Sequence, residues 1–278
     1  MPHLTVQGTE LFYRDWGTGR PVVFVTSWGL SSEMWRFQMP QLTERGFRAI
    51  GYDRRGHGRS DNPGTGYDFD TLADDLGALL EQLDLTEATL VGHSMGGGEV
   101  VRYLTRHGVS RVASIVLIGS TVPCLMRKPD NPNGIDPALL HATADAIRDD
   151  FGQWLTDNYP PFWGDGLPGC DLPQVIKDWT LQDLMKVSAD AAVACTRTNI
   201  AADFRDELAH LDLPALILHG EHDASAPVDL CARVSARLLP NSRLKVYPNA
   251  AHAIYLTHRE RLNADLLEFV REPVVQAA

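Results

Sequence analysis

Hydrophobic positions along the chain fall into two alternating patterns. Four short segments are predicted as strands, and those at residues 21–25 and 112–118 are almost continuously apolar, which is typical of strands covered on both faces. The four segments occupy residues 21–25, 47–53, 88–92 and 112–118. Three other segments carry apolar side chains at helical spacing, at residues 33–45, 70–83 and 95–107. Strands that alternate with helices in this way predict an α/β fold, in which helices cover both faces of a parallel sheet.

Further strands are predicted on either side of this region. Residues 3–8 and 11–16 alternate polar and apolar positions, which predicts a β-hairpin. The strand pattern returns at residues 213–218 and 243–247, and an amphipathic helix follows to about Val270. We therefore expect the later part of the chain to rejoin the sheet that the first part begins.

The alternation stops between about residues 120 and 203, where no strand is predicted. Prolines separate short helical patches in this segment, which also contains aromatic residues such as Trp154 and Trp179. The chain has 278 residues and is 44% apolar, enough for one large core. We predict a core formed by residues 1–119 and 204–278, with residues 120–203 inserted as a helical lid.

Charge and cysteine content narrow the classes of partner. The formal charge is −11, from 25 basic and 36 acidic residues, which disfavours nucleic acid and anionic membranes. The four cysteines lack the spacing of zinc or redox sites, so we expect buried thiols. No signal-peptide pattern is visible, and no apolar run approaches the roughly 20 residues of a membrane helix. We therefore expect a cytoplasmic protein that binds neither nucleic acid nor membrane.

Residues 92–96 read G-H-S-M-G and lie where a predicted strand meets a predicted helix. This G-x-S-x-G pattern matches the nucleophile elbow, a strained turn whose flanking positions must lack clashing side chains. Such a turn exposes the hydroxyl of Ser94 at the carboxyl end of the sheet and directs helix amides toward developing negative charge. Ser94 is the predicted nucleophile, and an ordinary glycine-rich turn is the alternative.

A serine hydroxyl needs a base, and in chains with this elbow the acid follows the serine and the histidine comes last. Asp223 lies in the polar loop after the strand at residues 213–218, and His252 follows the last predicted strand. We predict Asp223 as the acid and His252 as the base. Other candidates remain: His93, His219 and His258 for the base, and Glu221 and Asp229 for the acid.

Two further hypotheses concern the immediate surroundings of the nucleophile. His222, Asp223 and His252 suggest a metal site, but they lack the usual helix-borne spacing, so we expect none. Acyl transfer also needs hydrogen-bond donors aimed at the oxyanion. We predict the backbone amides of Met95, just after the nucleophile, and of Trp28, in the loop after the third strand.

Five stretches of the sequence match a known family. They are residues 13–17 (Y-R-D-W-G), 52–60 (Y-D-R-R-G-H-G-R-S), 92–98 (G-H-S-M-G-G-G), 100–103 (V-V-R-Y) and 202–205 (A-D-F-R). Over nearly its whole length the chain resembles the bacterial arylesterase and cofactor-free (non-haem) haloperoxidase or perhydrolase family of α/β-hydrolases. The resemblance implies an eight-stranded, mostly parallel sheet, a triad of Ser94, Asp223 and His252, and neither metal nor bound cofactor. Similar proteins often self-associate, so the resemblance is compatible with a homo-oligomer.

The sequence departs from this family's pattern near the predicted oxyanion loop. The usual His-Gly ahead of the oxyanion residue is replaced by Thr26 and Ser27, and the usual Pro-His-Gly around the base becomes A-H-A at residues 251–253. A proline associated with perhydrolysis often follows the oxyanion residue, whereas this chain has Gly29. We therefore favour ester hydrolysis over peracid formation.

Other residues are assigned supporting roles. In this family Asp53 looks structural, tying the glycine-rich loop beneath the site, and we expect Arg54 and Arg55 to help that loop pack. Substrate pockets are mainly apolar, and a plain core role is the alternative for each pocket candidate. These candidates are Leu125, Phe162, Trp163 and Ile254.

The function that these observations favour is a serine esterase of the arylesterase type acting on small carboxylic esters or lactones. Perhydrolase or haloperoxidase activity on the same serine is the first alternative. A non-catalytic ligand-binding protein with this fold is the second, supported only by the altered loop at Thr26 and Ser27.

Overall fold

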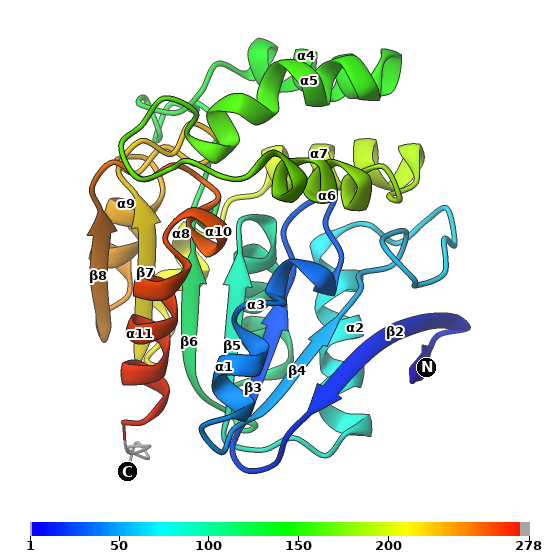
Figure 1. Cartoon of the computed structure of the whole chain (residues 1–278), viewed down its shortest axis with the longest axis vertical. Coiled ribbons are helices and arrows are strands. Elements are labelled where there is room, and N and C mark those ends of the chain that lie inside the picture. Colours follow the sequence, from blue (N-terminus) through cyan, green and yellow to red (C-terminus); the bar gives the residue numbers. More distant parts are fainter. Residues whose placement is uncertain (1, 273–278) are drawn as a thin grey trace.

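The structure, a computed structural model, describes residues 2–272 and is built around one eight-stranded sheet (Figure 1). Its strand order is β1-β2-β4-β3-β5-β6-β7-β8. The strands are β1 (His3–Val6), β2 (Thr9–Trp16), β3 (Pro21–Val25), β4 (Arg48–Tyr52), β5 (Ala88–His93), β6 (Val112–Ile118), β7 (Ala215–Gly220) and β8 (Ser242–Tyr247). Only the β1–β2 and β2–β4 pairings are antiparallel. The predicted α/β fold and its mostly parallel sheet are confirmed.

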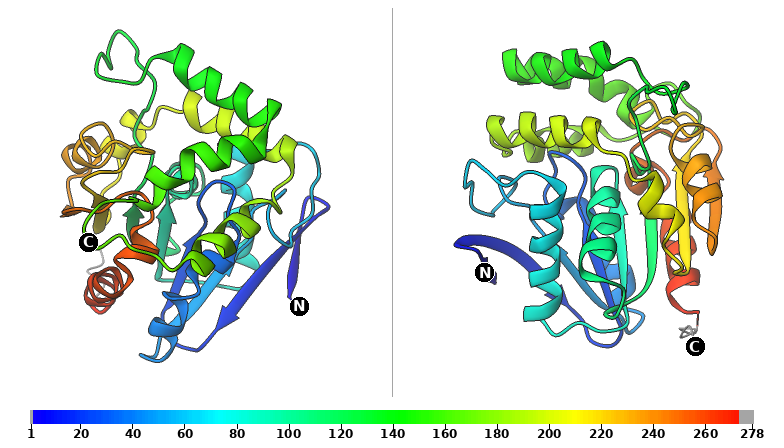
Figure 2. Two further views of the ribbon diagram at one scale, coloured as in Figure 1. Left: turned by 45° about the horizontal axis from the view of Figure 1, so that its top comes forward. Right: turned by 180° about the vertical axis from the view of Figure 1, so that it is seen from behind.

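Helices cover both faces of the sheet, and a hydrophobic cluster fills the space on each side (Figures 1 and 2). On one face lie α2 (Phe69–Gln82), α3 (Met95–His107), α8 (Arg205–Ala209) and α9 (Ala232–Leu238). On the other lie α1 (Met39–Thr43), α10 (Ile254–Thr257) and α11 (Arg259–Val270). Because both faces are covered, every residue of β3 and β5 is buried, which explains the unbroken apolar pattern of β3.

The predicted helix at residues 33–45 is divided in two. A 3-10 helix, η1 (Ser32–Trp35), is followed by a turn and then by α1. Pro40 lies in the first turn of α1. A proline is tolerated there because it lacks only an amide that has no partner, but inside a helix it would remove a hydrogen bond and clash with the preceding turn. The periodic pattern therefore spans two elements.

Of the five helices that lie between β6 and β7 in the described chain, the first four cover the carboxyl ends of the parallel strands (Figures 1 and 2). They are α4 (Pro137–Asp149), α5 (Phe151–Trp163), α6 (Gln174–Leu184) and α7 (Ala189–Ala201). We refer to these four helices as the lid. The helices are longer than the proline spacing suggests. Pro137 and Pro173 lie at helix starts, and Pro160 and Pro161 fall in the last turn of α5.

The buried thiols expected from the cysteine spacing are confirmed. The four cysteines, at positions 124, 170, 195 and 231, are all buried with free thiols. Between residues 2 and 272, no helix combines the length and apolar character that crossing a bilayer requires.

Candidate active site

The turn between β5 and α3 holds Ser94 in a conformation that few residues adopt. Its backbone angles are φ 55° and ψ −122°, a region that costs a non-glycine residue on the order of 1–3 kcal/mol. A Cβ at Gly92 would lie 2.6 Å from the carbonyl oxygen of Gly96, and one at Gly96 would lie 2.7 Å from that of Thr26. Both glycines of the G-x-S-x-G pattern are therefore required by close backbone contact.

Hydrogen bonds from α3 and from the end of β6 hold this strained turn. The Ser94 amide donates to the carbonyl of Ile118 at 3.0 Å, and the Ser94 carbonyl accepts from the amide of Gly97 at 3.1 Å. The Ser120 hydroxyl donates to the same Ser94 carbonyl at 3.2 Å. The backbone is fixed in this way while Ser94 contributes to the wall of a cavity above the sheet.

Asp223 and His252 come from the loops after β7 and β8 and form a buried pair. The Nδ1 of His252 lies 2.6 Å from Oδ2 of Asp223. The other carboxylate oxygen, Oδ1, accepts from the amides of Ser225 at 2.9 Å and Ala226 at 2.7 Å. Burial would raise the pKa of the Asp223 carboxyl, but the adjacent His252 and these donors hold it below its ordinary value. An ionised Asp223 assigns the proton to Nδ1 and leaves Nε2 as an acceptor.

His93 and His258, two of the other candidate bases, do not line the cavity. The Nε2 of His93 lies 3.1 Å from the carbonyl oxygen of His252, so this side chain supports the backbone of the candidate base. Burial lowers the pKa of His93 to about 3, and its imidazole is therefore neutral near pH 7. His258 packs beside Tyr247, with ring centroids 6.1 Å apart.

His219, the third alternative, fixes the loop that carries the candidate acid. Its Nε2 lies 2.6 Å from the carbonyl oxygen of Ala226 and 3.4 Å from Oδ2 of Asp223. The loop is thus bonded to a strand residue as well as to His252.

The competing carboxylates face other partners. Glu221 is half-exposed and lies 4.0 Å from the imidazole of His222, and Asp229 pairs with Arg233 at 2.8 Å. In the part of the chain that the structure describes, no group of three or more histidine, cysteine, aspartate or glutamate side chains is placed to hold a metal ion.

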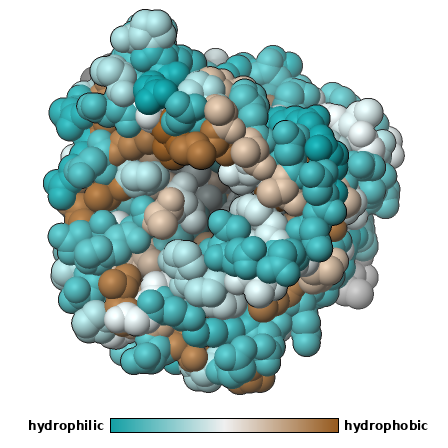
Figure 3. Space-filling model, turned by 90° about the horizontal axis from the view of Figure 1, so that it is seen from above, coloured by the Kyte–Doolittle hydropathy of each residue, from teal (hydrophilic) through white to brown (hydrophobic). Residues whose placement is uncertain are grey.

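Ser94 and His252 line the same cavity, which has a volume of about 320 Å³. Its walls include Trp28 from the core together with Leu125 and Phe162, two of the predicted pocket residues. Seen from the lid side, the surface has a hollow with hydrophobic side chains along its border (Figure 3). A larger groove, of about 460 Å³, lies between α1 and α11 and contains neither Ser94 nor His252.

The other two pocket predictions need correction, because Trp163 and Ile254 do not line this cavity. The ring of Trp163 packs edge-on against Tyr159, at 5.4 Å between centroids, and Lys177 lies over it at 5.3 Å. Ile254 begins α10 and is fully buried in the cluster on the α1 and α11 face of the sheet. For both residues the alternative, a core role, is the better description.

The two predicted oxyanion donors are the amides of Met95, which follows Ser94 in the chain, and of Trp28, which lines the same cavity as Ser94. Met95 is the first residue of α3, so its amide has no carbonyl partner within the helix. Trp28 lies between β3 and η1, outside every strand pairing, and lines the cavity. Its indole Nε1 donates to the carbonyl of Ala192 at 2.9 Å, and its ring stands edge-on to Trp154 at 5.3 Å.

Arg54 anchors the loop in which Thr26 and Ser27 replace the family's usual residues. The buried guanidinium donates to the carbonyl of Thr26 at 2.7 Å and to that of Ser27 at 3.0 Å. It also pairs with the fully buried Glu99, at 2.7 Å from Nε, and Tyr52 donates to the same carboxylate at 3.0 Å. Sequence reasoning missed Glu99, although a carboxylate on a buried helix face signals a buried partner.

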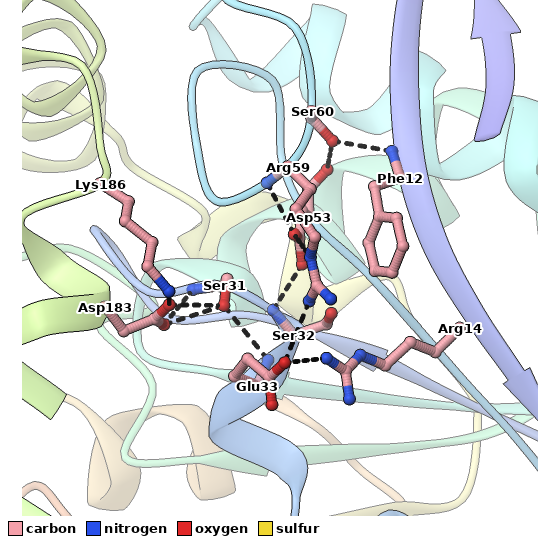
Figure 4. A network of polar contacts seen from close by, with 10 residues as sticks. All are labelled: Phe12, Arg14, Ser31, Ser32, Glu33, Asp53, Arg59, Ser60, Asp183 and Lys186. Atoms are coloured by element: carbon pink, nitrogen blue, oxygen red, sulfur yellow. Dashed lines mark hydrogen bonds and ion pairs between the residues drawn. The ribbon is translucent and has the colours of Figure 1, made fainter. Parts of the chain in front are cut away.

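Asp53 ties two loops together, as the sequence analysis expects. Its Oδ1 accepts from the amide of Ser32 at 2.7 Å, and its Oδ2 accepts from the amide of Arg59 at 2.9 Å (Figure 4). Arg55 packs the same glycine-rich loop by pairing with Asp75 at 2.6 and 2.7 Å.

Comparisons with known proteins agree with this fold. A family model described as the alpha/beta hydrolase fold matches residues 20–259. A non-heme haloperoxidase of Rhodococcus erythropolis is 42% identical over 97% of this chain and 99% of its own length. A bifunctional esterase/perhydrolase of Acinetobacter calcoaceticus is 37% identical over 96% and 98%. The structure of an esterase from Exiguobacterium antarcticum superposes with a TM-score of 0.91, at 31% identity, over 96% of this chain and 97% of that one.

These matches cover most of the chain, including the elbow and the loops of Asp223 and His252. The superposition on the esterase, with a TM-score of 0.91, agrees with the overall fold described above. The chain therefore belongs to the α/β-hydrolase fold family.

Proposed function

We propose that this protein is a serine hydrolase of the carboxylesterase or arylesterase type that cleaves small carboxylic esters or lactones through an acyl-enzyme. The observation that carries the proposal is the 2.6 Å contact between Asp223 and His252, with Ser94 on the wall of the same cavity as His252. A strained serine, an imidazole that can accept its proton and an ionised carboxylate are the three groups that this chemistry needs.

In the first half of the reaction, Ser94 Oγ attacks the ester carbonyl carbon while Nε2 of His252 takes the hydroxyl proton. The amides of Trp28 and Met95 donate to the oxyanion of the tetrahedral intermediate. The intermediate collapses when the bond to the alkoxide breaks and His252 returns the proton to that leaving group. Ser94 then carries the acyl group.

In the second half, His252 removes a proton from water, and the resulting nucleophile attacks the acyl carbon. The bond to Ser94 Oγ breaks, the serine recovers its proton from His252, and the carboxylic acid departs. Asp223 holds the imidazole in the required tautomer and offsets its positive charge in both halves.

The cavity favours an uncharged substrate. Its lining residues are either apolar or uncharged polar residues, and His252 is the one histidine among them. No lysine, arginine, aspartate or glutamate lies on the wall that the described residues form. Burying an unpaired charge against such a wall would be costly. A volume of about 320 Å³ fits a small acyl and alcohol portion.

A series of p-nitrophenyl esters and lactones of increasing size tests the proposal. We expect turnover of the short neutral esters by the parent protein and its loss in Ser94→Ala. Ser110→Ala, at an exposed position outside the cavity, is the matched control and should retain full activity. Normal ester turnover by Ser94→Ala would contradict the proposal.

Perhydrolysis is a second candidate because the relatives described above include a haloperoxidase and an esterase/perhydrolase. Hydrogen peroxide would replace water in attacking the acyl carbon, releasing a peracid and regenerating Ser94. Gly29 disfavours this candidate: its φ of 74° is closed to proline, whose ring holds φ near −65°. The loop therefore has a conformation that the perhydrolysis-associated proline would not adopt.

Halogenation of a dimedone-type acceptor in acetate with peroxide and bromide distinguishes the two reactions. Hydrolysis predicts halogenation far slower than ester turnover, and a rate above ester turnover would reverse the ranking. A non-catalytic binding protein would show neither activity and would not be labelled at Ser94 by a fluorophosphonate.

A further inference from the structure

The end of α6, a lid helix, is bonded directly to the segment that carries Trp28. Oδ2 of Asp183 accepts from the backbone amide of Ser31 at 2.9 Å, and Oδ1 accepts from the Ser31 hydroxyl at 2.8 Å. Figure 4 shows this carboxylate pointing at Ser31 from the lid side. Ser31 is three residues after Trp28, and only Gly29 and Leu30 separate them.

The core holds the two ends of this segment. At the start, Arg54 donates to the carbonyls of residues 26 and 27, and at the end Asp53 accepts from the amide of Ser32 at 2.7 Å. Neither anchor bonds to residues 28–31. The part of the loop that contains the Trp28 amide therefore depends on other contacts.

The lid supplies those contacts at three positions. Ala192 of α7 accepts from the Trp28 indole at 2.9 Å, and Asp183 of α6 holds Ser31. Between them, a Cβ built on Gly29 would lie 2.7 Å from Cδ2 of Leu184. This close contact leaves the loop little room to move toward the lid.

Asp183 is the strongest of the three lid contacts. Its side chain is 1% exposed, and the one cation paired with it among the described residues, Lys186, is 56% exposed and 3.4 Å away. The two donors of Ser31 therefore provide most of the stabilisation of this buried charge. Moving Ser31 away would leave the carboxylate with an unmade hydrogen bond in a dry environment, which is costly.

We propose that Asp183 is a positioning residue that fixes the Trp28 amide through Ser31, so that the lid forms part of the oxyanion site as well as covering the cavity. This inference rests on the proposed function, in which Trp28 donates to the oxyanion. An interaction that forms mainly in the transition state changes kcat more than KM. Loosening the loop should therefore slow the reaction without weakening binding of the ester.

Asp183→Asn is the principal variant, because it keeps the shape of the side chain but replaces one acceptor oxygen with a donor. Ser31→Ala removes only the hydroxyl contacts, and Ser31→Thr restores a hydroxyl at the same position. Asp165→Asn is the matched control, since Asp165 is an exposed aspartate near the lid that pairs with Lys177 at 2.5 Å.

Steady-state kinetics with a short p-nitrophenyl ester, normalised to sites titrated by a fluorophosphonate, provide the first readout. We expect Asp183→Asn to lower kcat by about 10- to 100-fold, less than the 10²- to 10³-fold that follows removal of an oxyanion donor itself. Its KM should stay within about threefold of the parent value. Ser31→Ala should lower kcat by a smaller factor, whereas Ser31→Thr and Asp165→Asn should stay close to the parent.

Inhibitor binding provides a readout that a purely structural role would not change. A trifluoromethyl ketone adds to the serine hydroxyl and places an oxyanion where the transition state has one, whereas the product carboxylic acid does not. We expect Asp183→Asn to weaken binding of the ketone by the same factor as kcat, and to leave binding of the acid unchanged.

Three results would overturn the inference. These are an unchanged kcat per titrated site, a rise in KM with unchanged kcat, and equal weakening of both inhibitors. If Asp183→Asn does not fold, the same kinetic and inhibitor measurements are made with Ser31→Ala. A failure of the proposed function can be distinguished from these results, because only then would Ser94→Ala retain ester turnover.

Discussion

The core and the lid both line the cavity with uncharged side chains, but they place their buried charges differently behind that wall. On the core side, buried charged groups bond to one another, as Asp223 does with His252 and Arg54 does with Glu99. On the lid side, the buried carboxylate of Asp183 is not part of the cavity wall and bonds instead to Ser31 of the core. This difference separates two tasks, because paired charges hold the reacting groups while neutral walls determine which substrate fits.

The largest effect is expected when one of the buried charges of the core is removed. Asp223→Asn keeps the shape of the acid but removes the charge that orients His252. We expect kcat to fall by about 10³- to 10⁴-fold, measured with a p-nitrophenyl ester at pH 8. A fall of less than tenfold would show that another carboxylate serves as the acid.

A second prediction concerns the stability of the core. Burial and the neighbouring Arg54 lower the pKa of His57 to about 3, whereas an unfolded histidine titrates near 6.5. Between these values the unfolded chain binds more protons, so stability falls as pH falls from about 6.5 toward 3. His57 alone contributes a slope of up to about 1.4 kcal/mol per pH unit.

Urea unfolding of the parent and His57→Gln between pH 7 and 4 measures this slope. The variant should show a shallower decrease in the free energy of unfolding on acidification, by roughly 1 kcal/mol per pH unit. Asp165→Asn, near the lid, should keep the parent slope. Parallel curves for parent and His57→Gln would contradict the assignment of a neutral buried imidazole.

A smaller effect is expected on the lid side, at the cavity wall. Leu125→Ala enlarges a cavity that is already apolar, so longer acyl groups should gain relative to acetate. We expect the ratio of kcat/KM for hexanoate over acetate to rise by about 3- to 10-fold. A uniform fall for every ester would instead indicate a loss of positioning.

The smallest effect tests an alternative acid. Asp229 is exposed and pairs with Arg233 at the surface, and such pairs contribute about 0–1 kcal/mol. Asp229→Asn should therefore change kcat by less than about twofold. A loss comparable to that of Asp223→Asn would reassign the acid.

The core was largely predictable from the sequence because its signals are local. Strand β5, the glycine pair around Ser94 and the start of α3 lie within one continuous segment that forms a recognisable motif, although the space at Gly96 is limited by the distant Thr26 carbonyl. The pairing of Asp223 with His252 was predicted from chain order after the strands. The prediction of one helix at residues 33–45 was wrong, because Pro40 begins a new helix and the apolar pattern spans two elements.

The lid was less predictable because its side chains are placed by contacts between distant segments. Trp163 and Phe162 are adjacent aromatic residues of α5, and only the direction of each side chain in the fold decides which of them faces the cavity. Asp183 was missed for the same reason, since its partner Ser31 lies 152 residues earlier in the chain. No local pattern marks such a pair.

The most direct test of the account is stoichiometric labelling with a fluorophosphonate followed by peptide mass spectrometry. The account predicts one adduct per chain, on Ser94, with loss of ester turnover in proportion to labelling and no adduct in Ser94→Ala. Ester turnover that survives complete labelling, or an adduct on a different serine that tracks the loss of activity, would contradict it.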